Sequence, residues 1–168
     1  DSTALALSMP NAIPVFTDTG WEFDALYQHI ERFEQVTGRH VERIVSKHGT
    51  LPEYIRSSKF MPGHGARFCT RMFKIEPLND WLQDKLPATL CIGLRADEQD
   101  TRVGNLSELI GLTIRYPFQE WGWTRMDCVK KCFEYELLPL YPVYMARGGC
   151  KGCFYKRYAE VKAMAQLV

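Results

Sequence analysis

The chain has 168 residues, 46% of them hydrophobic, and a formal net charge of +1 at pH 7. This length and composition predict one globular domain with a substantial core, and the near-zero charge gives no global case for a nucleic-acid or membrane partner. The sequence has no signal-peptide pattern and no apolar run long enough to span a membrane, so we expect a cytoplasmic protein.

The first residues predict a helix without the structure that should precede it. Asp1, Ser2 and Thr3 form a typical N-cap sequence before an apolar first turn, and no initiator Met precedes them. We therefore expect that a segment belonging ahead of this helix is absent from the chain.

Strands and helices are predicted to alternate along the rest of the sequence. Apolar runs that end in polar turns predict buried strands at residues 12–20, 40–46, 88–94 and 111–119. Helical spacing of apolar residues predicts helices at 22–38, 51–60, 68–86 (broken or paired around Pro77) and 124–137. This order is typical of an α/β fold with a doubly wound parallel sheet. Without repeats or linkers, residues 1–168 are expected to form a single domain.

Polar clusters follow two of the predicted strands. Thr17, Asp18 and Thr19 end the first strand, and the segment from Arg95 to Arg102 follows the third. Ligands of such sheets bind at the carboxyl ends of the strands, which makes both clusters candidate binding residues. The structural alternatives are that Asp18 caps its own turn and that Glu98 pairs with Arg102. Trp21 is interpreted as packing rather than as a stacking platform.

Six cysteines divide by their surroundings. Cys91 lies within an apolar strand and is most simply a small buried hydrophobe. Cys150 and Cys153 form a C-x-x-C motif between glycines, just before a basic, helix-like tail, and in a reducing compartment this favours metal or redox use over a structural disulfide. A plain dithiol is the alternative.

A four-thiolate site could be completed by Cys69 and one cysteine of the pair Cys128 and Cys132. Cys128 is the better candidate because it lies near a predicted helix start, whereas Cys132 lies among apolar residues. The four histidines show no metal spacing with these thiols, so an all-cysteine site for iron–sulfur or zinc is favoured. The alternative is that Cys69 and Cys132 are core residues.

Basic residues surround both cysteine groups. Arg56, Lys59, Arg67, Arg71 and Lys74 lie near Cys69 in the sequence, and Arg147, Lys151, Lys156 and Arg157 surround the C-x-x-C motif. Such charge would stabilise thiolates and attract an anionic substrate. The alternative is a solvated basic face.

The order of motifs resembles the phosphoadenylylsulfate (PAPS) reductase family of the PP-loop superfamily, in particular its short phage and bacterial members. Asp1-Ser2 resembles the end of an S-G-G-x-D-S loop, and "VFTDTGWEF" resembles a strand-end motif that contacts nucleotide. "RFCTRMFKIEPL" is similar to R-x-C-T-x-x-x-K-x-x-P, "GLRADEQDTR" is similar to G-x-R-x-x-E-x-x-x-R, and "GGCKGC" ends the series. The resemblance covers nearly the whole chain.

The resemblance implies a Rossmann-like sheet, with the first strand and most of the PP-loop missing here, that binds ATP or an adenylylsulfate-type nucleotide, with magnesium as a candidate ion. It implies nucleotide contacts from Asp1, Ser2, Thr17, Asp18, Thr19, Lys74, Arg95, Glu98 and Arg102. It also implies a 4Fe–4S cluster on Cys69, Cys128, Cys150 and Cys153, with zinc as the alternative. The cysteine segment would span about residues 128–168.

The chain also departs from the family pattern. It has Cys69-Thr70 where cluster-bearing reductases have paired cysteines, it has Phe154 where a proline often follows the C-x-x-C motif, and it ends without the cysteine-bearing tail that attacks sulfate. The first hypothesis is therefore a nucleotide-dependent enzyme of sulfur transfer or acceptor activation, whose partners would be nucleic acid, a sulfur or electron donor protein, or a second copy of the chain. The alternatives are PAPS or adenylylsulfate reduction and a metal-stabilised module without catalysis.

Overall fold

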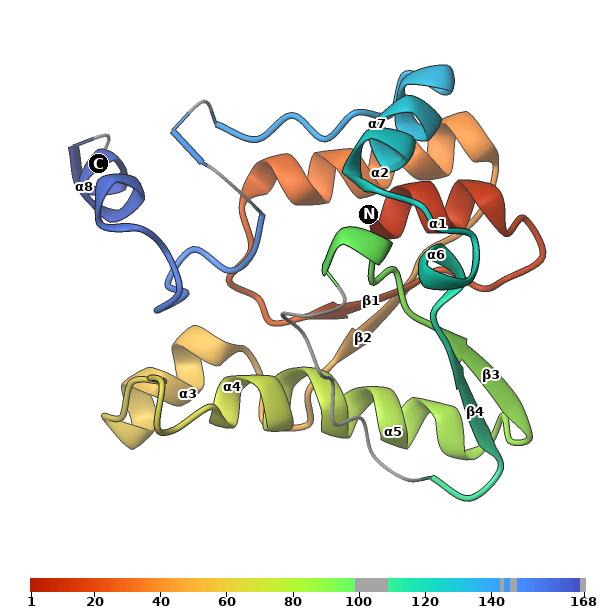
Figure 1. Ribbon diagram of the computed structural model, residues 1–168. Helices are drawn as coiled ribbons and strands as arrows, with labels where there is room; N and C mark the ends of the chain where they lie inside the picture. The colour runs from red at the N-terminus through yellow and green to blue at the C-terminus, as the bar shows by residue number, and fades with distance from the viewer. Residues whose placement is uncertain (99–108, 143, 146–147, 167–168) are drawn as a thin grey trace.

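The computed structural model describes residues 1–98, 109–142, 144–145 and 148–166 of the chain (Figure 1). The described strands are β1 (Val15–Asp18), β2 (Glu42–Val45), β3 (Ala88–Cys91) and β4 (Leu112–Arg115). The described α-helices are α1 (Ser2–Ser8), α2 (Asp24–Thr37), α3 (Leu51–Ser58), α4 (Phe68–Thr70), α5 (Glu76–Gln83), α6 (Pro117–Glu120), α7 (Arg125–Glu134) and α8 (Tyr158–Gln166). A π-helical segment (Arg71–Ile75) joins α4 to α5, and a 3₁₀ turn (Ala96–Glu98) follows β3.

The strands pair in parallel, as the alternation of strands and helices predicted. β1 pairs with β2, placing Thr17 opposite Ile44, and β3 pairs with β4, placing Leu90 opposite Ile114. Within the described part of the chain these are two separate two-stranded ladders. Parallel strands in each pair have their carboxyl ends at the same edge, so the polar residues that follow them are collected there.

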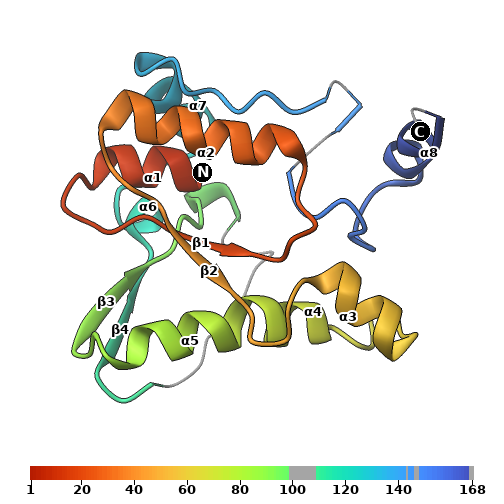
Figure 2. The same ribbon diagram turned by 180° about the vertical axis from the view of Figure 1, so that it is seen from behind.

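Helices cover both faces of the strands, which confirms the expected α/β class (Figures 1 and 2). Helices α1, α2 and α7 lie on one side of the strands, and α3, α4 and α5 lie on the other. On the first side the buried side chains belong to two clusters, one formed by Leu7, Ile30, Phe33, Val41 and Leu137 and one by Ala4, Leu5, Phe118, Cys128 and Cys132. On the second side they are Leu51, Met72 and Phe73. Burial of each large apolar side chain contributes about 1.5–3 kcal/mol.

Local sequence signals explain where several helices begin and end. Thr50 and Glu53 form a reciprocal capping box that starts α3. Thr124 and Asp127 do the same for α7, which confirms the helix predicted at 124–137. Helix α2 ends at Gly38, whose φ of +66° is the left-handed conformation that glycine adopts without a Cβ penalty.

Two predicted elements differ from the observed ones near a proline. The helix predicted at 68–86 does break, but its irregular part is the π-helical segment that precedes Pro77, because a proline cannot donate the backbone hydrogen bond of a regular helix. The strand predicted at 111–119 ends at Arg115, since Pro117 begins α6.

The C-terminal helix α8 lies apart from the helical layers, at the end of the molecule where α3 and α4 also lie (Figures 1 and 2). The C-x-x-C segment leads into this helix, so the motif is carried to the same end. Across the described ranges, no helix combines the length and apolar character required to cross a bilayer.

Candidate functional site

The carboxyl ends of β1 and β2 border a pocket of about 270 Å³. Its lining includes Asp18, Ser46, Thr50 and Glu53. Asp18, the last residue of β1, accepts hydrogen bonds from the Gly20 amide and from the Tyr27 hydroxyl, both at 2.8 Å. These bonds confirm that Asp18 caps its own turn, and the pocket beside it leaves the residue available to a ligand as well.

The next residue, Thr19, belongs to a buried polar cluster that sequence reasoning identified only in part. Thr19 is fully buried and donates a hydrogen bond from Oγ1 to Glu22 Oε1 at 3.0 Å. The Cys150 thiol donates to the same Glu22 oxygen at 3.2 Å, and its sulfur lies 3.6 Å from Thr19 Oγ1. Glu22 is only 3% exposed. A carboxylate buried to this degree requires hydrogen-bond donors such as the Thr19 hydroxyl and the Cys150 thiol. Glu22 was not among the site residues predicted from the sequence.

Backbone and ring contacts hold the C-x-x-C segment against the loop after β1. The Lys151 amide donates to the Trp21 carbonyl at 2.7 Å, and Lys151 Nζ forms an ion pair with Asp24 at 3.1 Å. The backbone of Gly152 lies so close to the Trp21 indole that a Cβ at this position would overlap the ring. Trp21 itself packs against the Leu51, Met72 and Phe73 cluster, as predicted for a packing residue.

The surroundings of Cys150 keep its sulfur protonated at neutral pH. Burial is the largest cause and raises the pKa of the Cys150 thiol from 9.0 to about 11. The positive charge of Lys74 acts in the opposite direction, and the negative charge of Glu22 adds to the increase in the pKa. Lys74, a predicted anion ligand, is therefore close enough to act electrostatically on this thiol.

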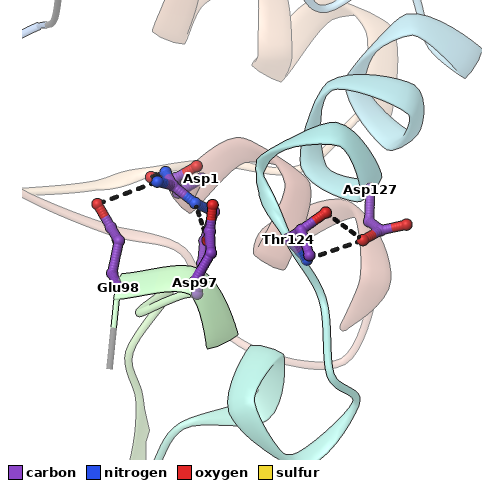
Figure 3. Close-up of polar contacts among 6 residues, drawn as sticks. Asp1, Asp97, Glu98, Thr124 and Asp127 are labelled. Atoms are coloured by element: carbon purple, nitrogen blue, oxygen red, sulfur yellow. Dashed lines mark hydrogen bonds and ion pairs between the residues drawn. The ribbon is translucent and has the colours of Figure 1, made fainter. Parts of the chain in front are cut away.

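A second polar cluster, which includes Asp1, Asp97 and Glu98 (Figure 3), surrounds Arg95 shortly after β3. The Arg95 guanidinium contacts the carboxylates of Asp1 at 2.7 Å, Asp97 at 2.8 Å and Glu98 at 3.2 Å. The hydrogen bond from Arg95 is the main cause that holds the pKa of Asp97 below its ordinary value. Three residues predicted together for nucleotide binding, Asp1, Arg95 and Glu98, are thus brought together by the fold. Arg102 lies outside the described residues.

The same cluster is attached to the start of α1 and to the start of α7. Asp1 directly precedes α1, and its backbone lies beside Gly93, just after β3. Ser2, the first residue of α1, is exposed. The Ala96 amide donates to the Trp123 carbonyl at 2.9 Å, just ahead of α7. Thr17 lies half-buried in β1. Of the predicted nucleotide residues, Thr17, Asp18 and Thr19 therefore lie at the end of β1, and Asp1, Arg95 and Glu98 lie together after β3.

The remaining predicted metal ligands lie in different surroundings. Cys69 is half-buried in α4 and packs against the same Leu51, Met72 and Phe73 cluster that Trp21 contacts. Cys128 is only 3% exposed and belongs to the core cluster with Ala4, Leu5 and Phe118. Burial raises the pKa of the Cys128 and Cys132 thiols above their ordinary value. Both thiols have the surroundings of core residues.

The predicted cluster site requires four thiols that converge on one point. No three histidine, cysteine, aspartate or glutamate side chains converge in a way that could hold a metal ion, within the residues that the structure describes. Cys69 packs against the Leu51, Met72 and Phe73 cluster, Cys150 contacts Thr19 and Glu22, and Cys128 packs in another cluster. The four cysteines in this arrangement do not fit a four-thiolate cluster, and the cluster stays a prediction.

Comparisons with known proteins identify the family of the chain. The family model described as the phosphoadenosine phosphosulfate reductase domain matches residues 2–110. That range contains the residues of both strand-end clusters except Asp1, contains Cys69, and stops before the C-x-x-C motif. No curated protein matches the sequence.

Proposed function

Because this chain belongs to the phosphoadenosine phosphosulfate reductase domain family, we propose that it is an enzyme that binds an adenine nucleotide at the ends of β1 and β3. We propose that it uses this nucleotide in sulfur transfer or in the activation of an acceptor for sulfur. Nucleotide-related sulfur metabolism is what the family supports, and the reaction itself is our proposal.

The observation that carries the proposal is the contact of Cys150 with the residues that follow β1. The sulfur lies 3.2 Å from Glu22 Oε1 and 3.6 Å from Thr19 Oγ1, directly after Asp18 and its pocket. A thiol from the C-terminal segment is thereby placed at the strand edge where ligands of parallel sheets bind. Sulfur chemistry on a nucleotide-activated group requires this proximity.

The charges at the end of β3 predict how the nucleotide would bind. The carboxylates of Asp1, Asp97 and Glu98 contact the Arg95 guanidinium at this strand end. Phosphate oxygens that approach these carboxylates would be repelled unless a cation accompanied them. Magnesium, which commonly binds through one or two carboxylates together with substrate phosphates, would supply that charge. We therefore propose that the nucleotide binds as its magnesium complex, with Arg95 contacting a phosphate.

In the proposed reaction an acceptor oxygen attacks the α-phosphorus of ATP and pyrophosphate leaves. A sulfur nucleophile then attacks the activated acceptor carbon, and AMP departs with the oxygen. An external persulfide would provide the sulfur. The Cys150 thiol loses its proton to solvent, its thiolate attacks the outer sulfur of that persulfide, and the donor thiol leaves, so that the Cys150 persulfide is the sulfur nucleophile. The Cys153 thiol then cleaves the disulfide between Cys150 and the acceptor, which releases the thiolated acceptor, and an external dithiol reduces the Cys150–Cys153 disulfide.

A second candidate is reduction of PAPS or adenylylsulfate, which the description of the matching family favours. That reaction would release sulfite and leave a nucleoside phosphate. It differs from the first in its product and in its need for a sulfonucleotide rather than ATP.

Nucleotide titration tests the proposal and separates the two candidates. ATP, AMP and PAPS are titrated calorimetrically into the protein, with and without magnesium, and sulfite release from PAPS is assayed with a dithiol reductant. Magnesium-dependent binding of ATP supports the first candidate, and sulfite release supports the second. Absence of binding by all three nucleotides contradicts both. Arg115→Gln, at an exposed arginine paired with Glu120, is the control for Arg95→Gln.

A further inference from the structure

Two segments that are distant in the sequence meet beside the C-x-x-C motif. The turn between α3 and α4 closes on itself through paired hydrogen bonds between Gly63 and Ala66, at 3.1 and 3.2 Å. Within this turn the His64 ring lies 5.0 Å from the Phe154 ring and 4.8 Å from the Tyr155 ring. Both views show these segments at the same end of the molecule (Figures 1 and 2).

Large aromatic side chains are exposed at this junction. Phe60 is 53% exposed, yet its ring is held 5.7 Å from the Phe68 ring at an interplanar angle of 31°. Tyr155 is 41% exposed, and the Arg67 guanidinium lies over it at 5.6 Å. An exposed ring that is fixed by its neighbours offers a flat surface for stacking at little entropic cost.

The same junction carries three exposed basic side chains. Arg56, Lys59 and Arg67 are all exposed, and none of them forms an ion pair with another described residue. Glu53 closes the capping box with Thr50 and also interacts electrostatically with Arg56, and Glu76 pairs with Arg71 at 2.9 Å.

We propose that this aromatic–basic face (Arg56, Lys59, Phe60, His64, Arg67 and Tyr155) binds single-stranded nucleic acid. Cations that track phosphates and rings that stack on unpaired bases are the two elements of such sites. A duplex keeps its bases stacked on each other, so the exposed rings favour a single strand over a duplex. An acidic peptide could use the cations but would gain little from the rings.

The aromatic–basic face lies next to Cys69 and Cys153 in the sequence, so nucleic acid bound there would be close to these thiols. Arg67 is two residues before Cys69, and Phe154 follows Cys153 directly. An unpaired base stacked on this face would lie beside the C-x-x-C segment, where the proposed function requires an acceptor. This role rests on the proposed function, whereas the binding itself does not.

The test is fluorescence anisotropy with a labelled oligonucleotide of about 12 nucleotides, a length within the usual site sizes. It is made as single-stranded RNA, as single-stranded DNA and as a duplex, and titrated with the protein in the absence of ATP. We expect both single strands to bind more tightly than the duplex. The affinity should fall with salt, because phosphate contacts release counterions.

Matched variants locate the binding on this face. Phe60→Ala should weaken binding about tenfold, the usual effect of losing one stacking ring, whereas Phe133→Ala, at a ring 70% exposed on α7, should leave it unchanged. Arg56→Gln should reduce the salt slope by about 0.7, the value for one phosphate contact of a single strand, and Arg32→Gln on α2 is its control. Circular dichroism verifies that each variant is folded.

The inference is overturned if the protein does not bind the oligonucleotides, if it binds duplex and single strand equally, or if the control variants lose as much affinity as Phe60→Ala and Arg56→Gln. It is also overturned if polyglutamate displaces the labelled strand as effectively as unlabelled oligonucleotide does, which would indicate an acidic protein partner. The ATP titration of the unmodified protein is independent of this assay. ATP binding without oligonucleotide binding would remove this inference alone, and the reverse result would remove the proposed nucleotide chemistry alone.

Discussion

The Cys150 thiol donates a hydrogen bond to the carboxylate of Glu22 across 3.2 Å, although 128 positions separate the two residues in the chain. This contact joins the C-terminal cysteine segment to the loop that follows β1. It connects the sulfur chemistry expected of the C-x-x-C motif to the strand edge that forms the candidate nucleotide site.

Glu22→Gln should make Cys150 more reactive. The carboxylate adds to the effect of burial in raising the pKa of the Cys150 thiol to about 11, so a neutral amide of the same shape lowers that pKa and increases the thiolate fraction near pH 9. The measurement is the rate of Cys150 alkylation by iodoacetamide between pH 7 and about 11, followed by peptide mass spectrometry. Glu31→Gln, at an exposed carboxylate of α2, is the control, and a pH profile that is the same in Glu22→Gln and in the wild type contradicts the expectation.

Gly152→Ala should displace the C-x-x-C segment from the strand end. A Cβ at this position would overlap the Trp21 indole, and such overpacking typically costs about 1–3 kcal/mol. The free energy of unfolding in urea and the alkylation rate of Cys150 report the two consequences. Gly65→Ala is the matched control, because a Cβ there would meet no atom within 4 Å. Equal stability of the two variants would show that the indole moves aside at no cost.

Arg95→Gln should weaken the binding of magnesium–ATP about tenfold, the loss of one charged contact. Removal of the guanidinium leaves the carboxylates of Asp1, Asp97 and Glu98 without their shared cation, which increases the repulsion of phosphate. Calorimetric titration measures the change, and binding should require magnesium in the wild type. Tight binding of ATP with a chelator present would contradict this charge argument.

Cys128→Ala should affect stability rather than metal content. The Cys128 side chain packs against Ala4, Leu5 and Phe118, so its truncation should cost about 1 kcal/mol of unfolding free energy. Iron, sulfide and zinc are assayed in protein purified without oxygen, for the wild type, Cys128→Ala and Cys150→Ala. The four-thiolate prediction requires iron to be lost in Cys128→Ala, and that result would contradict the packing interpretation.

The sequence predicted the elements of the fold well because each has a strong local signal. Thr124 and Asp127 predict the start of α7, and the apolar runs before Asp18 and Arg95 predict where two strands end. The grouping of Asp1, Arg95 and Glu98 was also predictable, through the order of motifs. Local patterns could not reveal the buried contact of Glu22, because its partner Cys150 lies far away in the sequence, in the C-terminal segment.

The most direct test of the account is protection of Cys150 by nucleotide. Cys150 is alkylated near pH 9 with magnesium alone and with magnesium–ATP at about tenfold above its Kd, where occupancy should slow the reaction about tenfold. If the nucleotide binds at the strand end beside Thr19 and Glu22, the rate falls, and Arg95→Gln reduces the protection at the same ATP concentration. An alkylation rate unaffected by bound ATP would show that the thiol and the nucleotide do not share a site.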